Sequence, residues 1–494
     1  MAPGSDPERL IAPGDARTPE IPGHVQSILE RLRGAGHRAF VVGGSLRDAL
    51  LGREPADWDV ATDAPPERIQ ALFPGSHYEN RFGTVLVPTP HEPGSATGGP
   101  AHAVADRPIA PLHPVEVTTF RRDHAYADHR RPERVTFTDS LEADLARRDF
   151  TINAIALGPD GLVDPQGGLG DLASQRIRAV GDPAERFDED ALRLLRAVRL
   201  AAQLGFEIEA GTLAAIKAHA TAVRHVSRER VGQELRKLLR APRPGRGLRL
   251  LAETGLLEAA LPPLAAQRGV AQDKIPGDDL WDHTVRTVDA AAELAPGDET
   301  LLLAALLHDI GKPETLADGH FYGHDEVGAR LAEAVLRDLA VPRREAQPVE
   351  GLVRWHMFRY EAAWSDAAVR RFIGRVGPEL LPRLLQLRAA DNVGSGGAAE
   401  VGGLAELAAR IAAQEAAAVP LRLADLAIDG DDLQAELGLA EGPQLGRLLQ
   451  RLLDSVLADP SRNARDVLLA DARAWTSEGR EAQDDPAEGP PGAP

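Results

Sequence analysis

The chain has 494 residues, more than one average domain holds, which predicts two to four domains. Its formal net charge of −19 argues against general nucleic-acid binding, because phosphate contacts need clustered Lys and Arg. Cysteine is absent, which excludes disulfides and thiolate metal sites, so any metal must sit on carboxylates and imidazoles. No apolar run approaches ~20 residues and the N-terminus lacks a secretory signal, so we expect a cytoplasmic protein without a membrane partner.

Both ends of the chain are rich in Pro, Gly, Asp and Glu, so residues 1–22 and 476–494 are predicted to be disordered tails. From Gly23 to about residue 160 the pattern mixes strands and helices. Three short runs are typical of strands: 37–43, 84–88 and 114–120. Residues 91–113 contain Pro, Gly and His without periodicity, which predicts a surface loop insertion of unknown purpose.

A glycine pair follows the first of these runs. Gly43 and Gly44 precede a helix that begins near Ser45, and such a turn brings backbone N–H groups and a helix N-terminus close to phosphate. Asp57 and Asp59 come in the next predicted strand, where residues two apart point to one face. The two carboxylates can therefore meet one site.

Two carboxylates at one edge are what a pair of Mg²⁺ ions needs, one to activate an attacking 3′-hydroxyl and both to neutralise a triphosphate. Glu116 lies in a further strand-like run, opposite in direction to Val115 and Val117, and is the candidate third carboxylate. Taken alone, an Asp-x-Asp pair is also typical of a solvated turn.

The block from Val41 to Thr62, VVGGSLRDALLGREPADWDVAT, resembles the first motif of class II tRNA nucleotidyltransferases. These are the CCA-adding enzymes and their bacterial poly(A) polymerase relatives, within the polymerase-beta-type superfamily. The resemblance implies that Asp57 and Asp59 hold Mg²⁺ and that Glu116 assists. It assigns nucleotide contacts in this block to Gly43, Gly44 and Arg47.

A second block, RRDFTINA, is similar to the family motif that holds the ribose and triphosphate. The resemblance implies that Arg147 and Arg148 contact phosphate oxygens, and that Asp149 and Asn153 contact the sugar. LVDPQGGLGDL, residues 162–172, is similar to the hinge between head and neck.

A third block, RFDEDALRLLRAVRL, resembles the motif that replaces a nucleic-acid template. Asp190 and Arg193 are three residues apart, so on a helix they share a face, and an acceptor beside a donor fork can read the edges of cytosine and adenine. Arg196, one turn further, would support the pair. The same spacing is also that of an ordinary intrahelical ion pair, worth about 0.3–0.5 kcal/mol.

The neck carries a local excess of positive charge. From Arg176 to Arg249 there are 16 Lys and Arg against 9 Asp and Glu, which is either an RNA footprint or a solvated helical face. VSRERVGQELRKLL resembles the fifth family motif, a neck helix beside the acceptor stem. The predicted RNA contacts are Arg228, Arg230, Arg236 and Lys237.

The segment 121–137, RRDHAYADHRRPERVTF, is similar to the flexible loop of members that add CCA or A, which CC-only members have shortened. Its polar candidates are Asp128, Arg130 and Arg131. The resemblance leaves open whether the chain adds CCA, adds only A, or synthesises poly(A).

A histidine–aspartate set follows, with His283 on a predicted helix and His308–Asp309 at the end of an apolar helix. Imidazoles with carboxylates suit several divalent metals, although a lone buried histidine is usually structural. The set resembles the HD superfamily, which binds one or two metals and hydrolyses phosphate esters. The implied ligands are His283, His308, Asp309, His324, His356 and Asp391, with Lys312 assisting phosphate charge; a purely scaffolding body is the alternative.

We therefore expect an α+β protein, with a small mixed-sheet head followed by an elongated all-helical part. The predicted parts are the head 23–160, neck 161–260, linker 261–279, HD domain 280–395 and helical tail 396–475. The expected function is CMP and AMP transfer from CTP and ATP to the 3′ end of tRNA. The tail would contact the tRNA elbow or simply pack, and the protein would be a monomer or a homodimer. An HD phosphohydrolase with an RNA-binding head is the alternative from another class.

Overall fold

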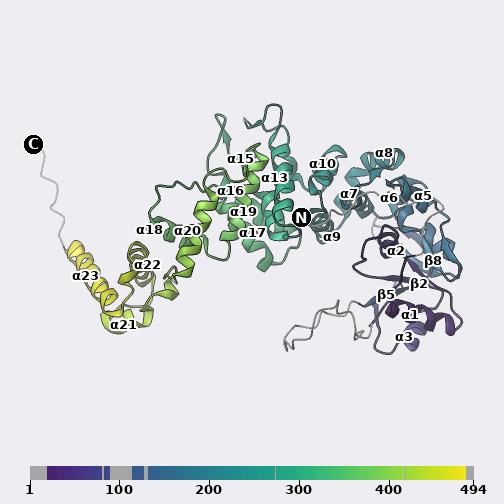
Figure 1. The fold of residues 1–494 in the computed structure, drawn as a ribbon, viewed down its shortest axis with the longest axis horizontal. Coiled ribbons are helices and arrows are strands. Elements are labelled where there is room, and N and C mark those ends of the chain that lie inside the picture. The colour runs from purple at the N-terminus through teal and green to yellow at the C-terminus, as the bar shows by residue number, and fades with distance from the viewer. Residues whose placement is uncertain are drawn as a thin grey trace, which may run out of the picture. The chain divides into compact units, whose positions relative to one another are not determined.

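The computed structural model describes residues 19–80, 83–88, 114–126, 132–272, 274–417 and 419–484 (Figure 1). The predicted N-terminal tail up to residue 18 and the predicted loop 91–113 lie outside these ranges. The chain divides into two compact units, residues 1–265 with 338–340, and residues 266–337 with 341–494. None of the described helices has the length and apolar character that a bilayer span requires.

The first unit contains a mixed sheet, as the sequence predicts, and the structure gives this sheet seven strands. Its order is β3 (His77–Asn80), β4 (Thr84–Val87), β5 (Val115–Thr119), β2 (Asp59–Thr62), β1 (Ala39–Val42), β8 (Ala156–Gly158) and β9 (Gly161–Val163). Among the described strands of this sheet, only the β2–β5 pair is parallel. The edge strand β9 pairs with β8, so the sheet extends past residue 160, the predicted end of the head.

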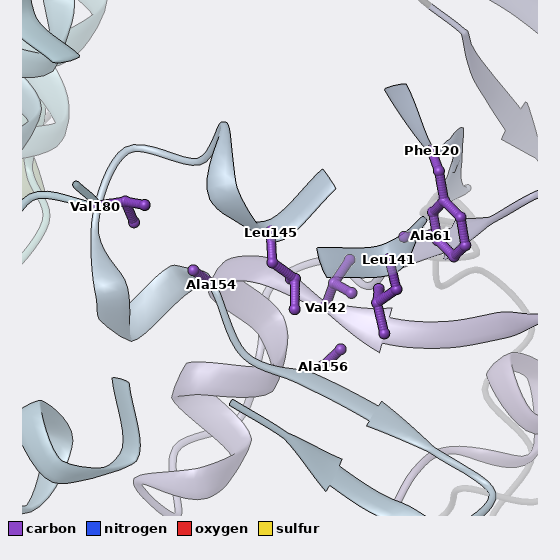
Figure 2. Close-up of a cluster of buried hydrophobic side chains, with 8 residues drawn as sticks. All are labelled: Val42, Ala61, Phe120, Leu141, Leu145, Ala154, Ala156 and Val180. Atoms are coloured by element: carbon purple, nitrogen blue, oxygen red, sulfur yellow. The ribbon is translucent and has the colours of Figure 1, made fainter. Parts of the chain in front are cut away.

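Helices and an apolar cluster pack against this sheet. Helices α1 (Gly23–Gly34) and α3 (Pro66–Leu72) pack against one another and against strands of the sheet (Figure 1). A cluster of buried apolar side chains includes Val42, Ala61 and Phe120 from the strands, together with Leu141 and Leu145 of α4 (Leu141–Ala146) (Figure 2). Alternation along β2 and its register with β1 put Ala61, Asp59 and Val42 on one face. The apolar cluster therefore anchors the same face that carries the acidic residue.

A hairpin occupies the segment that was predicted to be a flexible loop. Strands β6 (Arg121–Tyr126) and β7 (Pro132–Phe137) pair antiparallel. The resemblance to a flexible loop did not predict this strand pairing. Asp128, Arg130 and Arg131, the polar candidates of that segment, lie outside the described residues.

The rest of the first unit is mainly helical. Its helices are α2 (Gly43–Leu50), η1 (Thr151–Asn153), α5 (Gly168–Ala173), α6 (Pro183–Glu189), α7 (Leu192–Leu204), α8 (Ala210–His219), η2 (Ala220–His225), α9 (Arg228–Leu239), α10 (Pro244–Glu253), α11 (Leu256–Ala260) and α12 (Pro262–Ala265). A short parallel pair, β10 (Arg176–Ile177) with β11 (Glu207–Ile208), interrupts them. Amphipathic α7 packs on α9 and α10, which is the main contact of the neck.

The second unit is built of helices, and one of them, α14 (Glu299–Leu307), is apolar on every side and lies at the centre of several others. The helices of this unit follow in chain order. These are α13 (Leu280–Leu294), α14 (Glu299–Leu307), α15 (Lys312–Thr315), α16 (His324–Asp338), α17 (Arg343–Trp355), α18 (Asp366–Val376), α19 (Leu381–Gly394), α20 (Leu404–Ala416), η3 (Leu423–Asp425), α21 (Gly430–Leu437), α22 (Pro443–Ala458), η4 (Pro460–Arg462) and α23 (Arg465–Asp484). Residues Leu301–Leu307 of α14 are all buried, as expected of an all-round apolar helix. It packs on α13, α17 and α19.

The C-terminal helix corrects one prediction. Helix α23 continues to Asp484, so residues 476–484, predicted to be part of a disordered tail, are helical. A small hairpin of β12 (Leu316–Ala317) and β13 (His320–Phe321) also interrupts a region predicted to be almost wholly helical.

A close backbone approach fixes η1, which carries Asn153. Helix α5 packs on η1, and a Cβ on Gly168 would lie 2.1 Å from the backbone oxygen of Thr151. The hydroxyl of Thr151 donates to Asp171 of α5 at 2.6 Å. Only glycine at position 168 permits this approach.

We predict that Gly168→Ala separates α5 from η1. Overpacking of this kind costs about 1–3 kcal/mol, which lowers the melting temperature by about 2–10 °C in thermal unfolding. The matched control is Gly170→Ala in the same helix, because a Cβ there meets nothing within 4 Å. Equal melting temperatures for the two variants would contradict the prediction.

Candidate functional site

The β1–α2 turn lies against the carboxylate of Asp59. Gly43 has φ of 78°, and a Cβ on it would lie 2.7 Å from Asp59 Oδ2 and 3.1 Å from Arg148 Nη1. The hydroxyl of Ser45 donates to the oxygen of Val42 at 3.0 Å and accepts from the N–H of Asp59 at 3.2 Å. This hydroxyl ties the turn to the start of β2, which keeps the glycine turn beside the acid.

The predicted carboxylates do not all lie in strands. Asp59 is the first residue of β2 and is paired in register with Glu116 of β5, so their side chains leave the sheet together. Asp57 instead lies in the bend before β2, which corrects the prediction that the two aspartates share a strand. Its backbone precedes the ladder, whose first bond runs from the N–H of Glu116 to the oxygen of Trp58.

The electrostatics of Asp59 fit a cation. Burial raises the pKa of Asp59 to about 6; Arg148 opposes this shift, and the negative charge of Asp57 adds to it. A buried acid with a second acid nearby is stabilised in its charged form by a bound positive ion. Oxygen ligands of this kind suit Mg²⁺.

A cavity of about 370 Å³ opens beside Asp59. Six arginines line it: Arg121, Arg147, Arg148, Arg193, Arg196 and Arg230. Three aspartates line it too: Asp59, Asp149 and Asp190. The volume is in the range of small-molecule sites, and the surplus of guanidinium groups favours a polyanion such as a triphosphate.

Two of these arginines are aimed by one buried acid. Asp144 is buried and pairs with Arg147 at 2.6 Å and with Arg148 at 3.3 Å. Burial acts to raise the pKa of Asp144, but Arg147 and Arg148 outweigh it and lower that pKa. Asp144 therefore stays charged, and the sequence analysis missed it because nothing in its position distinguishes it from a surface helix acid.

Behind the cavity runs a chain of hydrogen bonds. Arg47 donates to Asn153 at 2.7 Å, Asn153 donates to Asp149 at 3.0 Å, and Arg196 contacts Asp149 at 2.6 Å. Arg47 and Asn153, predicted to contact the nucleotide, are buried in this chain and do not line the cavity. Asp149 and Arg196 line it, so α2 and η1 are connected to α7 through them.

The pair predicted to read the base is arranged differently from the prediction. Asp190 is not on the helix of Arg193: its backbone is extended, with φ of −145°, and its carboxylate accepts from the N–H of Leu192 at 3.0 Å. Among the described residues Asp190 pairs with Arg230 at 2.8 Å. Arg193 donates to Glu189 and to the backbone oxygens of Arg186 and Arg147. The intrahelical Asp–Arg pair is therefore wrong, while both side chains line the cavity.

Arg230 is a residue whose place the sequence did not reveal. It was grouped with Arg228, Arg236 and Lys237 as an RNA contact, but it lines the cavity and those three do not. No spacing along α9 distinguishes Arg230 from Arg228. Only the packing of α7 on α9 brings Arg230 to Asp190.

In the second unit, four histidines and two aspartates meet at the end of α14. His308 and Asp309 follow α14, His283 lies on α13, His324 begins α16 and His356 ends α17. Each of two triads could hold a metal: His283, His308 and Asp309, and Asp309, His324 and His356. Asp391 of α19 lies 3.3 Å from His283 Nε2. The structure thus brings all six predicted residues together.

The hydrogen bonds of three histidine rings leave one nitrogen of each ring available to a metal. His308, His324 and His356 each donate from Nδ1 to the backbone oxygen three residues earlier, at 2.8, 2.7 and 2.7 Å. A carbonyl only accepts, so the proton sits on Nδ1 and Nε2 keeps its lone pair. The Nε2 atoms of His324 and His356 are buried without a hydrogen-bond partner in the described chain, each 3.5 Å from Asp309 Oδ1.

Burial keeps the rings of two of these histidines neutral. It lowers the pKa of His308 and of His324, and neutral imidazole is the form that binds a metal. Burial acts to raise the pKa of Asp309, but His308 and Lys312 outweigh it and hold that pKa well below its usual value. Neutral nitrogen lone pairs around a charged oxygen make a ligand set for a divalent cation.

Three family models match the chain. They are "Poly A polymerase head domain" over residues 39–178, "Probable RNA and SrmB- binding site of polymerase A" over 205–268, and "HD domain" over 280–395.

Curated relatives cover both units. A CCA-adding enzyme of Anoxybacillus flavithermus is 32% identical over 447 residues, 90% of this chain and 94% of the relative. One of Levilactobacillus brevis is 34% identical over 446 residues, 90% of this chain and 95% of the relative. With one of Geobacillus thermodenitrificans the identity rises to 46% over 240 residues, 48% of this chain and 54% of the relative.

Solved structures agree in fold. The Bacillus stearothermophilus CCA-adding enzyme in complex with CTP is 28% identical, with a TM-score of 0.63, covering 93% of this chain and 98% of that one. The Thermotoga maritima CCA-adding enzyme complexed with tRNA is 18% identical with a TM-score of 0.51, covering 91% and 94%, and shows the fold alone.

We predict that Arg196→Leu makes stability depend on pH through Asp149. Burial acts to raise the pKa of Asp149, but Arg196 and its neighbours lower it, so this carboxylate stabilises the fold above pH ~4 and loses that effect as pH falls. Without Arg196 the buried charge of Asp149 is poorly paired, so the free energy of unfolding at pH 7 falls by about 1–3 kcal/mol. The loss is no larger because 35% of the Arg196 side chain is exposed and water already screens the pair.

In thermal unfolding, the deficit of Arg196→Leu should be constant from pH 7 down to about pH 4 and shrink as the pH falls below ~4. The control is the double variant Asp149→Asn/Arg196→Leu, whose deficit should not vary with pH. For the single variant, a deficit below pH ~4 as large as that at pH 7 would show that the pairing does not matter.

Proposed function

The chain belongs to the family of CCA-adding enzymes, and from this premise we propose that it transfers CMP and AMP from CTP and ATP to the 3′-hydroxyl of tRNA in the cytoplasm. The attacking hydroxyl loses its proton, its oxygen bonds to the α-phosphorus, the bond from the α-phosphorus to the oxygen that bridges to the β-phosphate breaks, and pyrophosphate leaves. The observation that carries the proposal is the register of Asp59 with Glu116 beside the Gly43 turn and a cavity lined by arginines.

We assign the acidic residues to metal binding. Asp57 and Asp59 would hold divalent cations, taken to be Mg²⁺, with Glu116 assisting. Such ions neutralise triphosphate charge and favour deprotonation of the attacking hydroxyl. The backbone of Gly43 and Gly44 gives the phosphates close access at the start of α2.

The arginines and polar side chains would place the nucleotide. Arg147 and Arg148, aimed by Asp144, contact phosphate oxygens, and Asp149 contacts the ribose. Asn153 holds Asp149 from behind, and Arg47 in turn holds Asn153.

Asp190 and Arg193 would read the base edge. Arg230 would hold Asp190 in place, and Arg196 would hold the adjacent Asp149. A free acceptor lone pair on Asp190 and an N–H on Arg193 match cytosine and adenine better than guanine or uracil. Arg228, Arg236 and Lys237 on α9 would contact the acceptor stem, and the helices after residue 396 the tRNA elbow.

We predict that Asp59→Asn reduces incorporation of labelled CMP into tRNA lacking CCA by at least about a hundredfold, because charge stabilisation by metals is worth several kcal/mol. Asp57→Ala should also abolish incorporation without unfolding the protein. The matched control is Asp160→Asn, an exposed acid of the same unit, which should retain full activity. Retained incorporation in Asp59→Asn would refute the assignment.

The same tRNA, given labelled CTP and ATP separately and together, separates CCA addition from its rivals. CCA addition predicts that CTP is used first and that ATP is added only once. An enzyme that adds only A or makes poly(A) would ignore CTP.

Base choice is tested at Asp190. Asp190→Ala should lower the preference for CTP and ATP over UTP and GTP by about 10–100-fold, because a polar partner of the base edge is lost. The control Asp188→Ala changes a neighbouring acid whose side chain is 58% exposed, and should keep the preference. An unchanged preference in Asp190→Ala would exclude it from base reading.

A second activity is favoured by the unpartnered Nε2 atoms of the histidine cluster. We propose that His283, His308, Asp309, His324, His356 and Asp391 hold one or two divalent metals and that the site hydrolyses phosphate esters. Such metals supply Lewis acidity and a more acidic water. Lys312, 2.7 Å from Asp309, would balance phosphate charge.

We predict that Asp309→Ala lowers metal affinity at least about a hundredfold, since this residue belongs to both triads. Metal content by elemental analysis and affinity by calorimetry measure this, while CMP incorporation by the head should persist. The control is Glu333→Ala, an exposed acid on α16. Equal metal content in both variants would favour a scaffolding role.

A further inference from the structure

One wall of the nucleotide cavity is formed by β4 and β5, away from the residues proposed to bind the nucleotide. Thr84 of β4 and Thr118 of β5 line the cavity there, beside Arg121 of β6. The register of the sheet puts both threonines on the face that carries Asp59 and Glu116. The hydroxyl oxygens of the two threonines lie 3.3 Å apart. This wall is therefore polar and carries a cation.

The geometry of the proposed transfer brings the acceptor to this wall. In phosphoryl transfer the attacking and leaving oxygens stand roughly in line, on opposite sides of the phosphorus. The leaving phosphates are assigned to the glycine turn after β1 and to Arg148, whose Nη1 lies 3.1 Å from where a Cβ on Gly43 would stand. In the sheet order β4–β5–β2–β1, this turn and the two threonines lie on opposite sides of Asp59. The attacking 3′-hydroxyl must therefore approach from the β4–β5 side.

An aromatic ring stands next to the same wall. Gly83 directly precedes Thr84, and a Cβ on Gly83 would lie 2.7 Å from Cε1 of Phe137. Phe137 is also the register partner of Arg121 in the β6–β7 hairpin, and paired side chains leave a hairpin on the same face. The ring of Phe137 therefore borders the cavity, beside the threonine and the arginine that line it.

Exposure distinguishes this ring from the core of the head. Phe137 is 41% exposed, whereas Phe120 near the same hairpin is fully buried. A lone exposed apolar residue is common on proteins and by itself indicates no ligand. Phe137 differs because it stands where the end of a polynucleotide has to approach. Unpaired bases stack on exposed aromatic rings, and such stacking accepts every base because each has a π-face.

We propose that Phe137 is a stacking platform for the 3′-terminal base of the tRNA, and that this stack places the attacking hydroxyl opposite the leaving pyrophosphate. The proposal rests on the transfer function proposed above and adds a positioning residue for its acceptor. A platform that accepts every base suits this reaction, because the terminal nucleotide changes with each addition. Phe137 takes no part in the proton transfer or in the bonds that form and break.

The test compares the KM for tRNA with the KM for CTP, each measured in the full chain with the other substrate saturating. Phe137→Leu keeps an apolar side chain against Gly83 but loses the ring. It should raise the KM for tRNA lacking CCA about 5- to 100-fold and leave the KM for CTP unchanged. Phe137→Tyr keeps the ring and should retain the wild-type values. The matched control is Tyr78→Leu, because Tyr78 is 43% exposed and its register with Val85 puts it on the opposite face of the sheet.

A tRNA whose terminal nucleotide lacks its base isolates the stack. The wild-type KM for this tRNA should rise, and Phe137→Leu should raise it no further, because the two changes remove the same contact. A Phe137→Leu effect of equal size on both tRNAs would overturn the inference. An equal rise in the KM for CTP, the pattern of a general structural defect, would also overturn it. Absence of CMP transfer by the wild-type protein would instead refute the transfer function, and the inference with it.

Discussion

The head depends on one strand pairing, the parallel register of β2 with β5. This pairing places Asp59 directly beside Glu116, and the hydroxyl of Ser45 fixes the start of β2 against the glycine turn. A shift of one residue would turn Asp59 to the opposite face and away from the turn. The apolar cluster around Phe120 and Ala61 on the same face makes such a shift costly, because it would expose buried side chains.

A second constraint lies in the charges that surround the nucleotide cavity. Many of its arginines are held by acids or backbone oxygens: Asp144 holds Arg147 and Arg148, Asp149 holds Arg196, and Asp190 meets Arg230. Guanidinium groups held in this way lose little freedom when a ligand arrives. Because Asp190 lies just before α7 and Arg230 lies on α9, the shape of the base-reading end depends on how α7 and α9 pack.

Much of both sites could be predicted from the sequence because their residues sit in local patterns. The glycine turn, the apolar strands and the His308–Asp309 doublet at the end of an apolar helix are short-range signals. The misses are of two kinds. Asp57 and Asp190 were assigned to regular elements that each begin two residues later. Asp144 and Arg230 were missed because their roles come from tertiary packing, which spacing along the chain does not encode.

The hydrogen bonds from His308, His324 and His356 to backbone oxygens have an energetic consequence. Each ring is fixed in tautomer and direction by a carbonyl of its own helix or turn, so its rotational freedom is lost when the chain folds. Binding a cation then requires little further ordering of side chains. The entropy that would otherwise oppose ion capture has already been given up in the folded protein, and the cluster is preorganised before any ion arrives.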